Sequence, residues 1–265
     1  MVDCDDYDGD GTTDIAYWRG NKGYWIYWDR LLEETVRVTW GESTDIPAPG
    51  DYDGDGTADP TYFRPGTGTW HVRNFTTIAL GQQDDIPVPA DYNGDGTTDY
   101  ATWRPSNGRW YVLPDPDEPS TYREVQWGVG AAGDIPLPGD YDGDGSDDFV
   151  TWRPKNGYWL VRDIFRTNWG VSGDAPRPLD FNADGAVDLC TWRPKVATWI
   201  IKDLGKYKLG YLTDYPITGD FDGDGYSDLV IFRPNTGIWQ IRYEDGSIES
   251  IRQGVGTDLP VVGRP

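Results

Sequence analysis

The chain has 265 residues, a formal net charge of −22, and 14 tryptophans and 17 tyrosines beside 34 glycines and 20 prolines. The acidity argues against nucleic acid and anionic membrane as partners, and no run approaches the roughly 18 apolar residues that a membrane span needs, so we expect no membrane insertion. The aromatic content argues against a disordered chain, despite the loop-rich content of glycine and proline.

A nine-residue acidic motif recurs six times and divides the chain into repeats. Its copies start 45, 40, 49, 40 and 40 residues apart, at Asp6, Asp51, Asp91, Asp140, Asp180 and Asp220. Units of about 40 residues bury their apolar faces only against one another. We therefore expect a single domain over residues 1–265.

The third repeat shows the order of elements that all repeats share. Residues 85–91 lead into the motif, and an alternating run over 100–104 follows it. A Pro-x-x-Gly turn separates this run from residues 109–113, and a last run over 125–128 ends in Trp-Gly. Alternating polarity, β-branched and aromatic residues, and glycine-bearing turns indicate four short antiparallel strands. Six such repeats predict an all-β fold, a six-bladed β-propeller with four-stranded antiparallel blades.

The two ends of the chain predict how the ring closes. Five repeats have an Asp-x-Pro segment before the motif, and the first repeat lacks one. The missing segment occurs at the other end, over residues 258–263. Propellers commonly complete one blade from both ends of the chain, which leaves no open sheet edge. We predict that residues 258–263 pair with the first repeat, with Asp258 near Arg19 and residues 1–5 beside them; a seventh blade beginning there is the alternative.

Each motif reads as a calcium loop, and we number the loops one to six in chain order. Oxygens at alternate positions suit Ca²⁺, which takes six to eight oxygen ligands, better than Mg²⁺, which demands a stricter octahedron. We expect about six structural Ca²⁺, one per repeat, held by side chains at positions one, three, five and nine and by the carbonyl at position seven. The ligands so predicted are Asp6, Asp8, Asp10, Thr12, Asp14; Asp51, Asp53, Asp55, Thr57, Asp59; Asp91, Asn93, Asp95, Thr97, Asp99; Asp140, Asp142, Asp144, Ser146, Asp148; Asp180, Asn182, Asp184, Ala186, Asp188; and Asp220, Asp222, Asp224, Tyr226, Asp228.

The position of the acids favours metal loops over loops without an ion. Twenty-two of the 45 acidic residues are carboxylates at these ligand positions, and six Ca²⁺ would bring the net charge from −22 to −10. Metal-free turns rich in Asp and Gly are the alternative, but four carboxylates at close range would repel one another strongly.

These motifs resemble the FG-GAP/VCBS repeat propellers, the class that includes the head of integrin α-subunits. The Asp-x-Asp-Gly-Asp-Gly-x-x-Asp loops and the glycines after each fourth strand carry the resemblance over essentially the whole chain. The Trp-Arg-Pro-x-x-Gly-x-Trp hairpins at 103–110 and 152–159 also resemble VCBS-like repeats of secreted bacterial proteins. The short FG and GAP sequence motifs are not intact, and the chain has six repeats where integrins have seven. We therefore do not assign integrin binding properties to this chain.

Two further sets of residues follow the repeat. Thirteen of the 14 tryptophans occupy three repeat positions, which favours packing between blades over sugar stacking, whereas Trp28 breaks the register and is expected to be exposed. Each second strand ends in an arginine and each first strand begins at an aspartate. We predict six ion pairs, with a ligand site built from the arginines as the alternative: Arg19–Asp258, Arg64–Asp45, Arg104–Asp85, Arg153–Asp134, Arg193–Asp174 and Arg233–Asp214.

The sequence contains no nucleophile–base pair, no phosphate loop and a single histidine, which argues against an enzyme. We expect a calcium-stabilised extracellular module, lectin-like or adhesive, that binds glycan or protein; the integrin resemblance implies a ligand face opposite the motif loops. A polysaccharide lyase or hydrolase is one alternative, and its acids should break the repeat, as Glu33, Glu34, Asp117 and Glu118 do. A structural unit of a larger surface protein is the other alternative.

The remaining features concern the cellular setting. Residues 1–3 do not begin a signal peptide, so we expect a mature or an excised domain. Cys4 and Cys190 occupy unrelated repeat positions and are expected to be free thiols. Calcium loops of millimolar affinity favour an extracellular setting.

Overall fold

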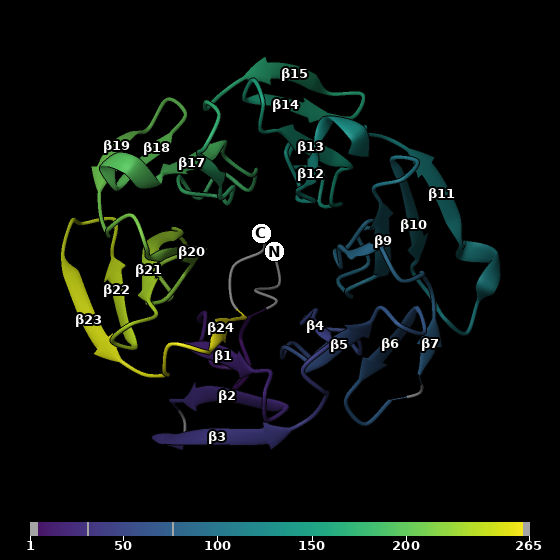
Figure 1. The fold of residues 1–265 in the computed structure, drawn as a ribbon, viewed down its shortest axis with the longest axis horizontal. Coiled ribbons are helices and arrows are strands. Elements are labelled where there is room, and N and C mark those ends of the chain that lie inside the picture. The colour runs from purple at the N-terminus through teal and green to yellow at the C-terminus, as the bar shows by residue number, and fades with distance from the viewer. Residues whose placement is uncertain (1–4, 31, 76, 262–265) are drawn as a thin grey trace.

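Six four-stranded antiparallel sheets surround a central axis in the computed structural model, which describes residues 5–30, 32–75 and 77–261 (Figure 1). The all-β, six-bladed propeller predicted from the repeats is confirmed. From the axis outward, the strands are β24 (Leu259–Pro260), β1 (Ala16–Arg19), β2 (Tyr24–Asp29) and β3 (Glu34–Thr39) in blade one; β4 (Ile46–Pro47), β5 (Thr61–Arg64), β6 (Thr69–Val72) and β7 (Ile78–Ala79) in blade two; β8 (Ile86–Pro87), β9 (Tyr100–Arg104), β10 (Arg109–Leu113) and β11 (Arg123–Gln126) in blade three; β12 (Ile135–Pro136), β13 (Val150–Arg153), β14 (Tyr158–Val161) and β15 (Phe165–Asn168) in blade four; β16 (Ala175–Pro176), β17 (Cys190–Arg193), β18 (Thr198–Ile201) and β19 (Gly205–Lys208) in blade five; and β20 (Tyr215–Gly219), β21 (Asp228–Arg233), β22 (Ile238–Arg242) and β23 (Ile248–Arg252) in blade six.

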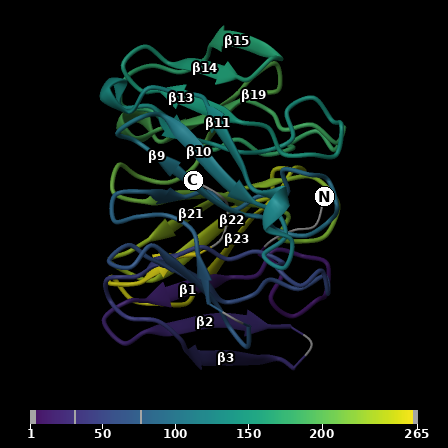
Figure 2. The ribbon, with the colours of Figure 1, turned by 90° about the vertical axis from the view of Figure 1, so that its right-hand side faces the viewer.

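Helical structure in the described residues is limited to three single-turn 3₁₀ segments, η1 (Pro119–Thr121), η2 (Gly130–Ala132) and η3 (Pro194–Val196). None of them could span a membrane. Seen from the side, the strands cross between two faces of the ring, and loop one lies on the face at the right (Figure 2).

The core lies between neighbouring blades and is dominated by tryptophan. In four blades the second and third strands place two tryptophans directly opposite each other, as in the pairs Trp103–Trp110 and Trp152–Trp159. The third-strand tryptophans of all six blades are at most 1% exposed. Stacked sheets need a large apolar side chain in each layer, which explains why the repeat keeps these residues. The packing interpretation of the tryptophans fits the structure.

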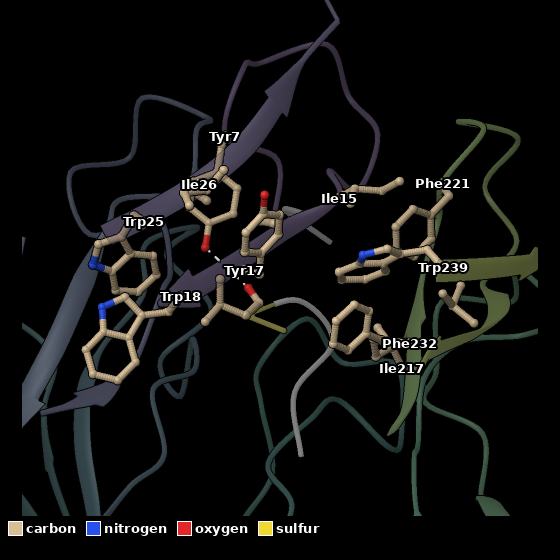
Figure 3. Packing of buried hydrophobic residues seen from close by; sticks show 14 of the residues in the cluster. Tyr7, Ile15, Tyr17, Trp18, Trp25, Ile26, Ile217, Phe221, Phe232 and Trp239 are labelled. Carbon is tan, nitrogen blue, oxygen red and sulfur yellow. Dashed lines mark hydrogen bonds between the residues drawn. The ribbon is translucent and has the colours of Figure 1, made fainter. Parts of the chain in front are cut away.

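The ring closes in blade one, where β24 from the end of the chain pairs antiparallel with β1 near its start. The Val261 N–H donates to the Ala16 carbonyl at 3.1 Å, and the Tyr7 hydroxyl donates to the Val261 carbonyl at 3.3 Å (Figure 3). The predicted closure is therefore confirmed, although its outermost parts, residues 1–4 and 262–265, lie outside the described residues. Cys190 is a buried free thiol, as expected, and Cys4 is not among the described residues.

Candidate metal sites

The first aspartate of each loop organises the backbone around itself. In loop two, Asp51 Oδ1 accepts the N–H of Gly54 at 2.7 Å, and Asp51 Oδ2 accepts the N–H of Gly56 at 3.0 Å. Both glycines have positive φ angles, 74° and 90°, a backbone conformation that residues with a Cβ atom disfavour. The glycines of the motif therefore let the chain wrap around the first carboxylate.

The ninth residue returns to the start of the loop. Asp59 forms a bridge with Gly50, and its Oδ2 accepts the N–H of Tyr52 at 3.0 Å. The equivalent contact of positions two and nine recurs in the other five loops. Position nine is thus held beside positions one and three, although it lies eight residues along the chain.

Three carboxylates converge in each of four loops, with one oxygen from each residue within 4.8 Å of the others. The converging residues are Asp6, Asp8 and Asp10; Asp51, Asp53 and Asp59; Asp140, Asp142 and Asp148; and Asp220, Asp222 and Asp228. Loops three and five have the amides Asn93 and Asn182 at position three, so their carboxylates are fewer.

Position five has a second role that the motif did not reveal. The Asp55 carboxylate accepts both the backbone N–H and the hydroxyl of Thr57, at 2.9 and 2.6 Å. These hydrogen bonds lower the pKa of Asp55. Positions five and seven therefore also shape the turn, and in loops two, four and six the fifth side chain stands outside the cluster of converging carboxylates.

Burial and mutual repulsion make the ninth carboxylate costly to ionise. Burial is the larger cause and the neighbouring loop aspartates add to it. The pKa is raised to about 8 for Asp14 and Asp228, about 7 for Asp59 and Asp99, and about 6 for Asp148 and Asp188. Oδ1 of Asp14 and Oδ1 of Asp99 are buried and lack a hydrogen-bond donor within the described part of the chain. An all-oxygen set with unsatisfied carboxylates fits a hard divalent cation such as Ca²⁺.

The six loops are hydrogen-bonded to one another in a closed circle. In each case the N–H at position eight donates to the carbonyl at position one of a neighbouring loop. The pairs are Thr13–Asp220 at 2.6 Å, Ala58–Asp6 at 2.5 Å, Thr98–Asp51 at 2.6 Å, Asp147–Asp91 at 2.7 Å, Val187–Asp140 at 2.7 Å and Ser227–Asp180 at 3.1 Å. The candidate metal sites are therefore parts of one continuous structure on one face of the ring.

The opposite face carries the six predicted arginine–aspartate pairs. In blade four, Arg153 Nε and Nη2 donate to the two carboxylate oxygens of Asp134 at 2.6 and 2.8 Å, and Asp134 Oδ2 also accepts the Val129 N–H at 2.9 Å. All six pairs form.

The aspartates of these pairs are buried, which the sequence did not show. The aspartate side chains are at most 1% exposed, whereas the arginine side chains are 19–34% exposed. Each pair joins a second strand to the connection that enters the first strand of its own blade. This bidentate pairing favours a structural role of the arginines over a ligand site.

Two grooves between blades are features that the sequence analysis did not identify. A groove of about 530 Å³ between blades two and three is lined by Leu80, Arg104, Tyr111, Leu113 and Tyr122, among others. A groove of about 700 Å³ between blades six and one is lined in part by Trp28, Arg30, Tyr243, Glu249 and Gln253. Trp28 is half-buried there, so the expectation that it is exposed was wrong.

Residues 217–248, which span most of blade six and include loop six, match the family model of the FG-GAP repeat. Together with the ring of six blades, this match supports an FG-GAP repeat β-propeller. No curated protein matches the chain.

Several solved structures share the overall fold of this six-bladed propeller. A lectin of Agrocybe aegerita, described for specific recognition of non-reducing terminal N-acetylglucosamine, is 12% identical with a TM-score of 0.56, covering 90% of this chain and 79% of the lectin. A streptogramin B lyase is 12% identical with a TM-score of 0.56, covering 97% and 86%. The virginiamycin B lyase of Staphylococcus aureus is 11% identical with a TM-score of 0.56, covering 90% and 80%. At these identities the similarity shows the fold alone.

Proposed function

We propose that this protein is a calcium-stabilised extracellular propeller that acts as a non-catalytic binding module for glycan or protein. The observation that carries the proposal is the closed circle of six loops, four of which bring three carboxylates together. Among these carboxylates, Asp10 of loop one has an arginine nearby, with Arg30 Nη1 4.0 Å from its Oδ2. A structural ion would hold positions one, three and nine together in loops two, four and six, and positions one, three and five together in loop one. The repetition of one constellation six times supports a structural role for the metal, because an active site usually occurs once.

The proposed extracellular setting follows from the calcium chemistry. Open loops of this kind bind calcium in a range that extracellular concentrations saturate. The FG-GAP repeat is consistent with this setting.

The binding role is supported by the form of the molecule. A lectin with this fold binds a sugar, which makes glycan a reasonable ligand class for a propeller. The acids that depart from the repeat, Glu33, Glu34, Asp117 and Glu118, are all exposed, which is typical of solvated loops. A buried acid–base pair would favour the lyase or hydrolase alternative instead.

Calcium titration by calorimetry and a glycan array with and without chelator test the proposal together. We expect about six Ca²⁺ per chain and ligand binding that is lost when calcium is removed. A chain that binds no calcium contradicts the metal part. Calcium binding without any glycan or protein ligand contradicts the binding part and favours a structural unit of a larger assembly.

A further inference from the structure

Three of the interfaces between blades are closed by a tryptophan that follows the fourth strand. Its indole N–H donates to a third-strand carbonyl of the next blade: Trp40 to His71 at 3.2 Å, Trp127 to Leu160 at 2.9 Å, and Trp169 to Ile200 at 3.1 Å. We call these three residues the inter-blade tryptophans. Each is half-buried, because its ring fills the outer part of an interface.

The interface between blades six and one lacks this residue. Gln253 stands at the corresponding position, and its Oε1 is buried without a hydrogen-bond donor in the described residues. An amide side chain is much smaller than an indole, so it leaves the outer part of the interface open. The 700 Å³ groove lies at this interface.

Blade one departs from the repeat at the same place. Three residues after the third-strand tryptophan, four repeats have a long basic side chain, namely Arg73, Arg162, Lys202 and Arg242. Such a side chain can cover its neighbour, since the Arg242 guanidinium lies 4.8 Å from the ring centroid of Tyr207 in blade five. Repeat one has Trp28 at this position, and Trp28 lines the groove. Two substitutions relative to the repeat, Gln253 in blade six and Trp28 in blade one, therefore line the same groove.

The walls of the groove combine flat apolar surface with a few polar groups. Ile15 of blade one points toward Phe221 of blade six, and both line the groove (Figure 3). Trp28 and Tyr243 add two aromatic side chains, one from each blade. A pyranose ring has an apolar C–H face, which packs well against an aromatic ring.

The polar groups can both donate and accept hydrogen bonds. The Tyr243 hydroxyl donates to Glu249 Oε2 at 2.7 Å, which leaves Glu249 Oε1 as an acceptor. Arg30 is held by Nη1 to Thr12 Oγ1 at 2.8 Å and Nη2 to the Phe221 carbonyl at 2.7 Å, and each of these nitrogens keeps a second N–H. A mixed set of this kind suits hydroxyl groups, which donate and accept in turn.

The charges of the groove select against charged ligands. Arg30 and Arg252 give the lining two positive charges, and Glu249 gives it one negative charge. Arg30 Nη1 also lies 4.0 Å from Asp10 Oδ2. Asp222 also lines the groove, but it is position three of loop six, where a bound cation would offset its charge. The lining therefore holds two carboxylates and two arginines, so an anion or a cation would meet like charges as well as opposite ones, whereas a neutral ligand would meet no net charge.

We propose that the groove between blades six and one is a binding site for one or two residues of an uncharged saccharide, with Trp28 as the stacking surface. A volume of about 700 Å³ lies within the range of ligand pockets. The inference rests on the proposed binding function and narrows it to a ligand class and a single site per chain. Stacking on Trp28 would bury sugar C–H groups, while Glu249 and Arg30 orient the hydroxyls.

The test uses the calcium-saturated full chain and four probes: maltotriose, cellotriose, N,N′,N″-triacetylchitotriose and the charged trigalacturonate. Affinities are measured by calorimetry and by saturation-transfer NMR for the wild type, Trp28→Ala, Gln253→Trp and the control Phe75→Ala. Phe75 is an exposed aromatic residue of blade two, away from the groove. Gln253→Trp introduces the residue that closes three other interfaces, so it should fill the groove while preserving the fold.

We expect at least one neutral probe to bind with a stoichiometry of one and trigalacturonate to bind at least tenfold more weakly. Trp28→Ala and Gln253→Trp should each weaken binding at least tenfold, and Phe75→Ala should leave it unchanged. Should Trp28→Ala fail to fold, Gln253→Trp still decides the location. Wild-type affinity in Gln253→Trp overturns the groove as the site, even if glycan binding itself persists. Failure of every neutral probe overturns the inference, whereas a protein ligand found in a separate screen would leave the broader binding function intact.

Discussion

The carboxylates on the two faces of the ring differ in how their negative charge is compensated. On the arginine face, Asp134 and its five equivalents are buried, and each is neutralised by an arginine from its own blade. On the loop face, carboxylates such as Asp51, Asp53 and Asp59 lie close to one another. The hydrogen bonds that Asp51 and Asp59 accept come from backbone N–H groups. The carboxylates at one end of a blade are therefore neutralised within the protein, whereas we propose that those at the other end are neutralised by a cation from solution.

Removal of calcium should have the largest effect, because it acts on the loop face in all six repeats at once. A site occupied at 100 times its Kd contributes about 2.7 kcal/mol to the free energy of unfolding. We expect excess EGTA to lower the melting temperature by more than about 10 °C, measured by circular dichroism or calorimetry. An unchanged melting curve would show that the loop face needs no ion. Magnesium at equal concentration serves as the control and should restore less stability than calcium.

Truncation after Gly256 tests the one arginine–aspartate pair that joins the two ends of the chain. The change removes β24 and leaves Arg19 without Asp258, which it contacts at 2.7 Å. We expect a cooperative loss of more than about 4 kcal/mol in urea unfolding at saturating calcium, because an open sheet edge and an unpaired charge result. Asp258→Ala keeps β24 and should give an intermediate loss. A truncated chain as stable as the full chain would contradict closure through blade one.

Arg153→Ala probes the arginine face within a single blade. It leaves the fully buried Asp134 carboxylate without its cation, so we expect a loss of about 3 kcal/mol in urea unfolding. Arg162→Ala is the matched control in the same blade, because Arg162 contacts Asp163 at 3.4 Å with both side chains exposed. That control should cost less than about 1 kcal/mol. Equal effects of the two substitutions would mean that burial of Asp134 does not matter.

Asp53→Ala probes the loop face within a single blade and should have the smallest effect. It removes one converging carboxylate from loop two, while the other five loops are untouched. We expect the calcium stoichiometry to fall from six to five and stability to fall by up to about 2.7 kcal/mol at calcium concentrations 100 times Kd. In excess EGTA the variant and the wild type should melt at nearly the same temperature. A loss of all six ions would instead indicate that the hydrogen-bonded circle makes the sites strongly cooperative.

The interfaces between blades contain contacts that the repeat pattern does not predict. Trp40 and Trp127 were recognised as packing residues because they recur, and the structure gives them that role. Trp28 was recognised only as an exception, and its expected exposure was wrong. Its surroundings depend on Gln253, which lies 225 residues later in the sequence and in another blade. No pattern within one repeat contains that pairing.

The loops show the same limit on a smaller scale. Their position, their glycines and the set of candidate ligands follow from the motif, because backbone geometry over nine residues is local. The motif did not distinguish Asp55, which is bonded to Thr57, from Asp53, which belongs to the converging group. It also did not reveal the hydrogen bond from Thr98 to the Asp51 carbonyl, since that contact joins two loops.

The six blades, the closure of the ring and the partners of the buried ion pairs can all be predicted from the amino-acid sequence. These features repeat, and short-range geometry and strand register specify them in every copy. The burial of the aspartates in those pairs, the circle of loops and the groove between blades six and one became evident only in the folded ring. Burial and grooves depend on the shapes of side chains that meet across two blades, so they are set by the packing of the whole ring and not by any single repeat.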